Sequence, residues 1–266
     1  MGRFFKDNLF TVVLIVILAV RSIMNNNFFS DPLGWLIDML LLIPGIIIGI
    51  TVHEYAHALA AYKLGDMTPK YQKRVSLNPL RHIDPIGFVA LLLIGFGWGK
   101  PVEVNPYAFR NSRRSNLITD VAGIATNFVF AFIFMGLASL FVRTAGAQIT
   151  GATNFTSLGG FINQVAYLKY LDPSAGSTFV YYVCIVLWYI VLMNLVLMIF
   201  NLLPVPPLDG FGIVTELFNL RNKPIYNQLY SMGFPILILL IVLNVPSRVI
   251  SPIINAIFTL LENIFF

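Results

Sequence analysis

Long stretches without a charged residue constrain this chain more than any other feature of its sequence. The longest runs from 173 to 208, and two others cover 9–20 and 39–53. Only 11% of the 266 residues are charged, whereas soluble globular domains carry about 25%. Roughly 20 apolar residues in a helix are enough to cross the hydrocarbon core of a bilayer. We therefore expect an all-α polytopic membrane protein.

The apolar runs predict six transmembrane helices within a single domain that covers 1–266. Their expected ranges are 9–24, 35–64, 116–142, 178–203, 232–245 and 249–266. A glycine-rich segment, Ile86–Trp98, is too short to span and is expected to be re-entrant, with its backbone satisfied by protein or water. The first run follows Arg3 and Lys6, as in a signal peptide, but no small-residue cleavage pattern follows it. We expect this run to be retained.

Two short segments alternate as strands do, "KRVSLNP" (73–79) and "KPVEVNP" (100–106). Each ends at Asn-Pro, which is a turn signal. They are expected to pair as a small cytoplasmic-side β-hairpin or sheet within 70–106, beside the re-entrant segment. Two ordinary loops are the alternative.

Lysine and arginine are concentrated between the second and third predicted spans. The basic residues there are Lys70, Lys73, Arg74, Arg81, Lys100, Arg110, Arg113 and Arg114. The loop at 25–34 has none, and the loop at 144–177 has only Lys169. By the positive-inside rule, 66–115, 204–231 and both termini are expected in the cytoplasm. This distribution explains the net charge of +5 as a signal of topology, so no nucleic-acid partner is expected.

The second predicted span contains His53-Glu54-Tyr55-Ala56-His57, which fits the pattern H-E-x-x-H. Two histidines four residues apart project from one face of a helix and can bind one Zn²⁺, while the glutamate can act as general base. Ionisable residues inside spans are costly and are functional by default. A structural zinc site is the alternative, but it normally takes four protein ligands.

A catalytic zinc needs a third protein ligand and one open position. The candidates near apolar sequence are Asp38, Asp120, Asp209, Glu216, Glu262 and His82. Asp209 is favoured because it follows Pro204, Pro206 and Pro207, which break the preceding span and free backbone carbonyls at the depth expected for His53. An ordinary turn is the alternative at Asp209, since Pro-Pro-Leu-Asp-Gly is rich in residues that favour turns.

Two amides, Asn127 and Asn201, lie within or at the edge of apolar spans. Such amides often join helices by hydrogen bonds. The alternative is that they position the substrate or stabilise an oxyanion near the metal.

With these residues in hand, the chain resembles the site-2 protease family of intramembrane zinc metalloproteases, in a short prokaryotic form without a PDZ domain. The resemblance rests on His53–His57, "NPLRHIDPIG" (78–87), "GWGKPVEVNP" (97–106), "AGIATN" (122–127) and "NLLPVPPLDG" (201–210). It implies that His53, His57 and Asp209 bind one zinc ion and that Glu54 is the base. It also places Gly123 and Asn127 in the family's Gly-x-x-x-Asn feature beside the active site, with Ile124 where the family usually has proline.

The resemblance implies hydrolysis of peptide bonds within transmembrane segments, in a prokaryotic plasma membrane. The expected partners are transmembrane protein substrates and the lipid bilayer. An unwound substrate could pair with an edge strand at Val102, Glu103 and Val104 by β-augmentation. A metal transporter and a catalytically inactive relative that binds transmembrane partners are the alternatives. Transporters often show internal repeats, and none is found in this sequence.

Overall fold

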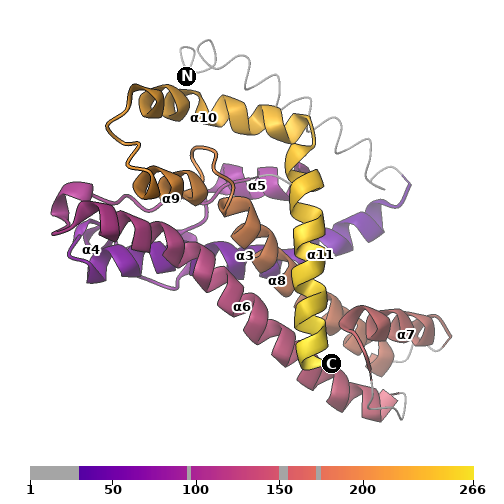
Figure 1. Ribbon diagram of the computed structural model, residues 1–266. Coiled ribbons are helices and arrows are strands. Elements are labelled where there is room, and N and C mark those ends of the chain that lie inside the picture. The colour runs from indigo at the N-terminus through magenta and orange to yellow at the C-terminus, as the bar shows by residue number, and fades with distance from the viewer. Residues whose placement is uncertain (1–29, 95–96, 150–154, 172–174) are drawn as a thin grey trace.

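The protein is built from helices, as the computed structural model in Figure 1 shows. The structure describes residues 30–94, 97–149, 155–171 and 175–266. The predicted first span at 9–24 therefore lies outside the described residues. Within the described ranges there is no β-strand. The expected all-α class is confirmed for this part of the chain.

Three long helices form the centre of the molecule and pack against one another: α3, α6 and α8. The helices are α3 (Pro32–Lys63), α4 (Thr68–Tyr71), α5 (Pro85–Ile94), α6 (Ser112–Ile149), α7 (Leu158–Leu171), α8 (Ala175–Asn201), α9 (Asp209–Leu217), α10 (Pro224–Val242) and α11 (Val245–Phe265). Two short 3₁₀ turns are η1 (Pro79–Arg81) and η2 (Pro106–Ala108). Helix α9 packs on α6, and α11 packs on α8 and α6.

Four of the described helices are long and apolar enough to cross a membrane: α3, α6, α8 and α11. Helix α10 makes a fifth if its two halves, bent by 56°, count as one span. The predicted ranges 35–64, 116–142, 178–203, 232–245 and 249–266 fall on α3, α6, α8, α10 and α11. A multi-pass membrane protein is thus supported, while the number of six spans is not confirmed.

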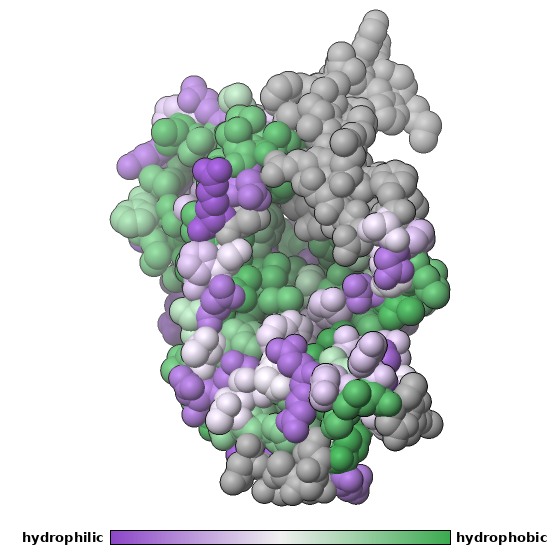
Figure 2. All heavy atoms as spheres, turned by 90° about the vertical axis from the view of Figure 1, so that its right-hand side faces the viewer, coloured by the Kyte–Doolittle hydropathy of each residue, from purple (hydrophilic) through white to green (hydrophobic). Residues whose placement is uncertain are grey.

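Apolar side chains cover much of the outside of the molecule, as Figure 2 shows for one face. Helix α6 alone exposes Phe128, Val129, Phe132, Ile133, Leu137 and Leu140. Soluble monomers rarely present apolar patches of this extent. These surfaces are suited to contact with lipid.

The predicted pairing of 73–79 with 100–106 is not seen. In the described residues of this region the only strand-like contact is an isolated antiparallel bridge between Ile83 and Gly99. The side chain of Arg74 explains the difference, because its guanidinium group donates to two carbonyl groups at the start of 100–106. A side chain thus occupies the acceptors that a β-ladder would use.

The two Asn-Pro pairs are confirmed as turn signals. The side chain of Asn78 accepts from the N–H of Leu80 at 3.0 Å and starts η1. Asn105 accepts from the N–H of Tyr107 at 3.1 Å and starts η2.

The segment expected to be re-entrant, Ile86–Trp98, contains α5 and then turns back. Helix α5 has ten residues and is about 15 Å long, half of a hydrocarbon core of about 30 Å. Trp98 lies against Gly87, at the start of α5. The chain therefore returns along the helix, as a re-entrant segment must. The position of this segment in a bilayer stays a prediction.

Helix α7 lies within the stretch 144–177, for which only a loop was expected. Its buried side chains are Leu158, Phe161, Ile162 and Val165. Their spacing of three, four and seven residues forms one apolar stripe, which packs against α8. This helical spacing of apolar residues is present in the sequence. The helix was not expected because it is too short and too polar to span a membrane.

Candidate metal and active site

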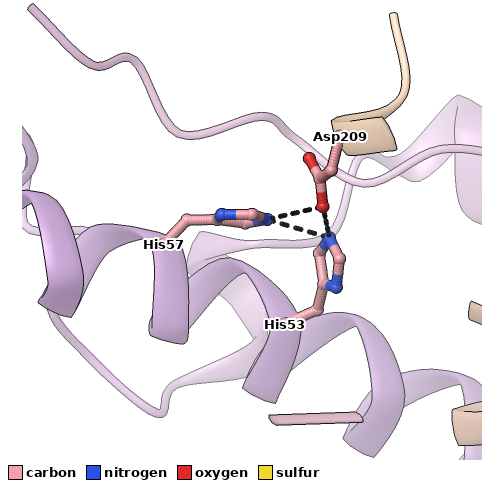
Figure 3. A group of neighbouring side chains, drawn as sticks. All are labelled: His53, His57 and Asp209. Atoms are coloured by element: carbon pink, nitrogen blue, oxygen red, sulfur yellow. Dashed lines mark hydrogen bonds and ion pairs between the residues drawn. The ribbon is translucent and has the colours of Figure 1, made fainter. Parts of the chain in front are cut away.

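The two histidines of the predicted zinc pattern lie one helical turn apart on α3 (Figure 3). The helix begins with a capped end, where the side chain of Asp31 accepts from the N–H of Gly34 at 2.9 Å. His53 and His57 are both buried. Their imidazole rings project from the same side of the helix, with the two Nε2 atoms 3.0 Å apart. The spacing of four residues therefore gives the convergence expected from the sequence.

The side chain of Asp209 completes the cluster from a second element. It lies in the first turn of α9, after the proline-rich break that follows α8. Its Oδ2 atom lies 3.3 Å from Nε2 of His53 and 3.2 Å from Nε2 of His57. Gly210 makes the return possible, because a Cβ atom there would overlap the carbonyl oxygen of Leu202 at the end of α8. The close approach of the first turn of α9 to the residues just beyond α8 sets Asp209 against the histidines.

The three side chains fit a divalent metal ion. In a tetrahedral zinc site with bonds of roughly 2.0–2.1 Å, neighbouring ligand atoms lie about 3.3 Å apart. The separations of 3.0, 3.2 and 3.3 Å found here are close to this value. The Oδ2 atom of Asp209 is buried and has no hydrogen-bond partner, an arrangement that is costly unless a cation or a donor satisfies it. Two neutral imidazoles and one carboxylate are a donor set typical of catalytic zinc.

Helix α6 holds the far side of each imidazole ring. The Nδ1 atom of His57 donates to the backbone carbonyl of Thr119 at 2.7 Å. The Nδ1 atom of His53 lies 2.7 Å from Oδ1 of Asn127. A hydrogen on Nδ1 leaves the lone pair on Nε2, which is the atom that faces Asp209. Such partners behind metal-binding histidines are common and raise metal affinity.

Gly123 lets α6 pass close to the two rings. A Cβ atom at this position would lie 2.7 Å from Cε1 of His53 and would overlap Nε2 of His57. Asn127 lies one helical turn further along the same face. Ile124, in the place where the family usually has proline, is buried in the hydrophobic core, and α6 runs through it without a break.

Glu54 is partly exposed and lies at the edge of the same cavity as the histidines. Its Oε2 atom accepts a hydrogen bond of 3.1 Å from the backbone N–H of Val102. The carboxylate is therefore close to the metal cluster and also joined to the segment 100–105.

The cluster opens into a cavity of about 630 Å³. This volume is within the range of roughly 300–1,000 Å³ that is usual for ligand sites. Its apolar walls come from α3, α5, α8 and α10, through Ile50, Leu91, Met193, Val196, Leu197, Phe200 and Leu237. The polar part of its lining includes the metal cluster, Glu54, Thr119, Asp120 and Asn201.

Four further residues predicted to contact a substrate lie in or near this cavity. Val102, Val104 and Asn201 line it. Glu103 is exposed and instead accepts a hydrogen bond of 2.6 Å from Gln72. From Val102 to Asn105, partly buried and exposed positions alternate, although the segment is not paired in a sheet.

The acidic alternatives on α9 and α11 have other partners. Glu216 is buried, forms an ion pair with Arg221 and accepts from Nδ2 of Asn116 at 2.9 Å. Glu262 accepts from the N–H of Leu158 at 3.0 Å. Both carboxylates join helices together and lie outside the metal cluster.

The remaining candidate ligands are also outside the cluster. His82 is fully buried, and its Nε2 atom donates to the carbonyl of Ser76 at 2.6 Å. Burial lowers the pKa of His82, so its ring is neutral at pH 7. Asp38 is exposed near the start of α3, and Asp120 lines the cavity without joining the cluster.

Two residues of the site were missed in the sequence. Asn194 of α8 is fully buried and contacts Asn127; its signal was an amide in the middle of an uncharged run. Arg74 is also buried, and its guanidinium group donates to the carbonyls of Arg81, Lys100 and Pro101. Nothing in the local pattern separates Arg74 from the other basic residues of its loop.

The comparisons with known proteins identify the family of the chain. The model of Peptidase family M50 matches residues 41–244, which contain the whole cluster. The chain is 35% identical over 211 residues to a Bacillus subtilis protein named "Putative zinc metalloprotease YwhC", covering 79% of this chain and 84% of that one. It is 26% identical over 221 residues to "Putative zinc metalloprotease Rip2" of Mycolicibacterium smegmatis, covering 82% and 72%. No solved structure matches. The resemblance to site-2 proteases is thereby confirmed, and the chain belongs to Peptidase family M50.

Proposed function

We propose that this protein is an intramembrane zinc metalloprotease that hydrolyses peptide bonds within or near transmembrane segments of other membrane proteins. One observation carries the proposal. Two imidazoles on a membrane helix and one carboxylate converge within 3.3 Å, and Glu54 lines the same cavity. The printed names of the relatives, which call them zinc metalloproteases, support the same chemistry.

His53, His57 and Asp209 would hold one zinc ion. The ion would supply a Lewis acid that polarises the scissile carbonyl group. The protein leaves the metal cluster open toward the cavity, where a peptide can approach it. A site with three protein ligands and an accessible fourth position is typical of catalytic zinc.

Glu54 acts as the general base and then as the general acid. It follows His53 in the sequence, lines the cavity and lies within reach of a water molecule beside the cluster. It takes a proton from the attacking water and returns it to the leaving amine as the peptide bond breaks. Water reaches the cavity from the cytoplasmic side, which we assign from the distribution of lysine and arginine.

The substrate is an extended apolar segment of a transmembrane protein. A helical peptide bond is shielded by its own side chains and already hydrogen-bonded, so the segment must unwind before it is cut. The apolar walls of the cavity suit such a segment. Val102 and Val104 line the cavity, so the backbone between them is suited to pair with an extended chain.

The test is cleavage in liposomes. Wild type, Glu54→Gln and a control variant, Asp38→Asn, are reconstituted with zinc and a panel of tagged single-span membrane proteins. Asp38 is exposed on the same helix, about 22 Å from His53 at 1.5 Å per residue. Wild type and the control should cleave at least one substrate, and Glu54→Gln should retain zinc without cleaving.

The two alternative functions give different results in the same assay. Zinc flux across the liposome without proteolysis would identify a transporter. Stable capture of single-span proteins by wild type, with no cleavage of any of them, would identify an inactive relative.

A further inference from the structure

Two buried amide side chains connect α8 with His53. Asn127 of α6 and Asn194 of α8 are both fully buried. The Nδ2 atom of Asn127 donates to Oδ1 of Asn194 at 2.9 Å, and the Oδ1 atom of Asn127 faces Nδ1 of His53 at 2.7 Å. Neither amide lines the cavity, so a substrate does not explain their presence. Polar side chains that are buried in this way almost always have hydrogen-bond partners.

The orientation of each amide is fixed by a backbone carbonyl, which can only accept. The Nδ2 atom of Asn194 donates to the carbonyl of Ile190 at 2.8 Å, so its Oδ1 atom is turned toward Asn127. The Nδ2 atom of Asn127 donates to the carbonyl of Gly49 at 3.1 Å as well as to Asn194. Both N–H groups of Asn127 are therefore used, and only its oxygen is left for His53.

This chain of hydrogen bonds has a direction. An amide oxygen facing Nδ1 of His53 requires the ring hydrogen to be on Nδ1. The lone pair is then on Nε2, the atom that faces Asp209 at 3.3 Å. We propose that Asn194 is a positioning residue of the metal site, which acts through Asn127 to hold His53 in the form that can bind metal through Nε2. This inference rests on the proposed function, because it takes His53 as a zinc ligand.

The two histidines differ in how they are held. His57 is fixed by the carbonyl of Thr119, a backbone group that needs no orienting partner. His53 is fixed by a side-chain amide that could present either end to the ring. Without Asn194, one N–H of Asn127 loses its acceptor, and only the carbonyl of Gly49 still opposes the alternative orientation of the amide. The role of Asn194 is thus to disfavour that alternative further.

The experiment measures zinc affinity in the full chain, purified in detergent, by competition with a chromophoric chelator. The variants are Asn194→Leu, Asn127→Leu, the double variant and a control, Met198→Leu. Met198 is buried on α8 outside the cavity lining, so the control tests a change in the packing of the same helix. The visible absorption spectrum of the cobalt-substituted protein reports the geometry of the ligands.

We expect Asn194→Leu to lower zinc affinity by about tenfold, the lower end of the range for partners behind a metal ligand, and to change the cobalt spectrum. Because Asn194 acts through Asn127, the double variant should bind zinc no more weakly than Asn127→Leu alone. Met198→Leu should match wild type. If Asn194→Leu does not fold, Asn194→Ser is measured in its place, since a hydroxyl group is too short to reach Asn127.

Zinc affinity and a cobalt spectrum equal to wild type in the Asn194 variant would overturn the inference. Independent, additive losses in the double variant would do the same. The variant Asp209→Asn separates this failure from failure of the proposed function. If Asp209→Asn also leaves zinc affinity unchanged, the metal site itself is wrongly assigned; if it abolishes binding, only the role of Asn194 is refuted.

Discussion

The backbone N–H of Val102 donates to the carboxylate of Glu54 at 3.1 Å. The proposed base is thereby joined to the segment proposed to bind the substrate. A hydrogen bond to a carboxylate is among the stronger ones in proteins. The position of the segment 100–105 and the position of Glu54 are consequently coupled, and changes that loosen the segment should affect catalysis without removing the metal.

The first prediction concerns Arg74, which holds that segment. Replacement by methionine leaves the carbonyls of Lys100 and Pro101 without their donor. We expect a loss of stability of about 1–3 kcal/mol, and a higher KM with zinc affinity unchanged. In Arg74→Lys the KM should lie between the values of wild type and Arg74→Met. One ammonium group can reach some of the carbonyls, but it lacks the several N–H donors that a guanidinium group holds in a fixed arrangement.

Cleavage kinetics on one substrate from the liposome panel, together with chelator competition, check this result. A parallel loss of zinc in Arg74→Met would show that Arg74 supports the metal cluster instead of the segment.

The second prediction concerns the third ligand. Asp209→Asn replaces a charged metal ligand with a neutral one of the same size. We therefore expect zinc affinity to fall by more than about 100-fold, which is more than the usual effect of removing a residue that hydrogen-bonds to a ligand. Asp38→Asn should bind zinc as wild type does. Metal content after dialysis and chelator competition measure both. Retention of one zinc per chain by Asp209→Asn would exclude Asp209 as a ligand.

The third prediction concerns the approach of α6 to the histidines. In Gly123→Ala the new methyl group would overlap His57 and lie 2.7 Å from the ring of His53. We expect a loss of about 1–3 kcal/mol in stability and a loss of zinc binding.

Gly176→Ala is the matched control for Gly123→Ala, because nothing lies within 4 Å of a Cβ atom at that position. It should be neutral or stabilising by up to about 1 kcal/mol. Thermal unfolding in detergent and zinc content compare the two variants. Equal behaviour of both would refute the close packing at Gly123.

The fourth prediction concerns removal of the metal. The ligands come from two elements, α3 and α9, so a bound ion stabilises the folded state by mass action. A strong chelator should therefore lower the unfolding temperature of wild type, and added zinc should restore it. The unfolding temperature of Asp209→Asn should not respond to the chelator. An equal response of both proteins would mean that the ion binds elsewhere.

Much of the site could be read from local sequence. His53, Glu54 and His57 lie within five residues of one helix, and helical geometry alone brings the two imidazoles to one face. The long apolar runs likewise required helices, because a backbone in lipid must satisfy its own hydrogen bonds. Asp209 was favoured among several candidates because of the proline break before it and its expected depth, and the family resemblance then implied it as a ligand.

The β-pairing of 73–79 with 100–106 was predicted from alternation and is not present. The alternation of apolar and polar residues indicates which side chains are buried. It does not indicate which groups form hydrogen bonds with the backbone. Here a buried guanidinium group, from Arg74, takes carbonyls that a neighbouring strand would use.

The sequence by itself determined the membrane class and the half of the metal site that lies on one helix, because both depend on interactions between near neighbours in the chain. Only the tertiary structure decided that Asp209 meets the histidines, that Gly123 makes room for their rings, and that Asn194 reaches His53 through Asn127. These contacts join α3, α6, α8 and α9 across 66 residues or more. They depend on how helices pack, which a local pattern does not encode.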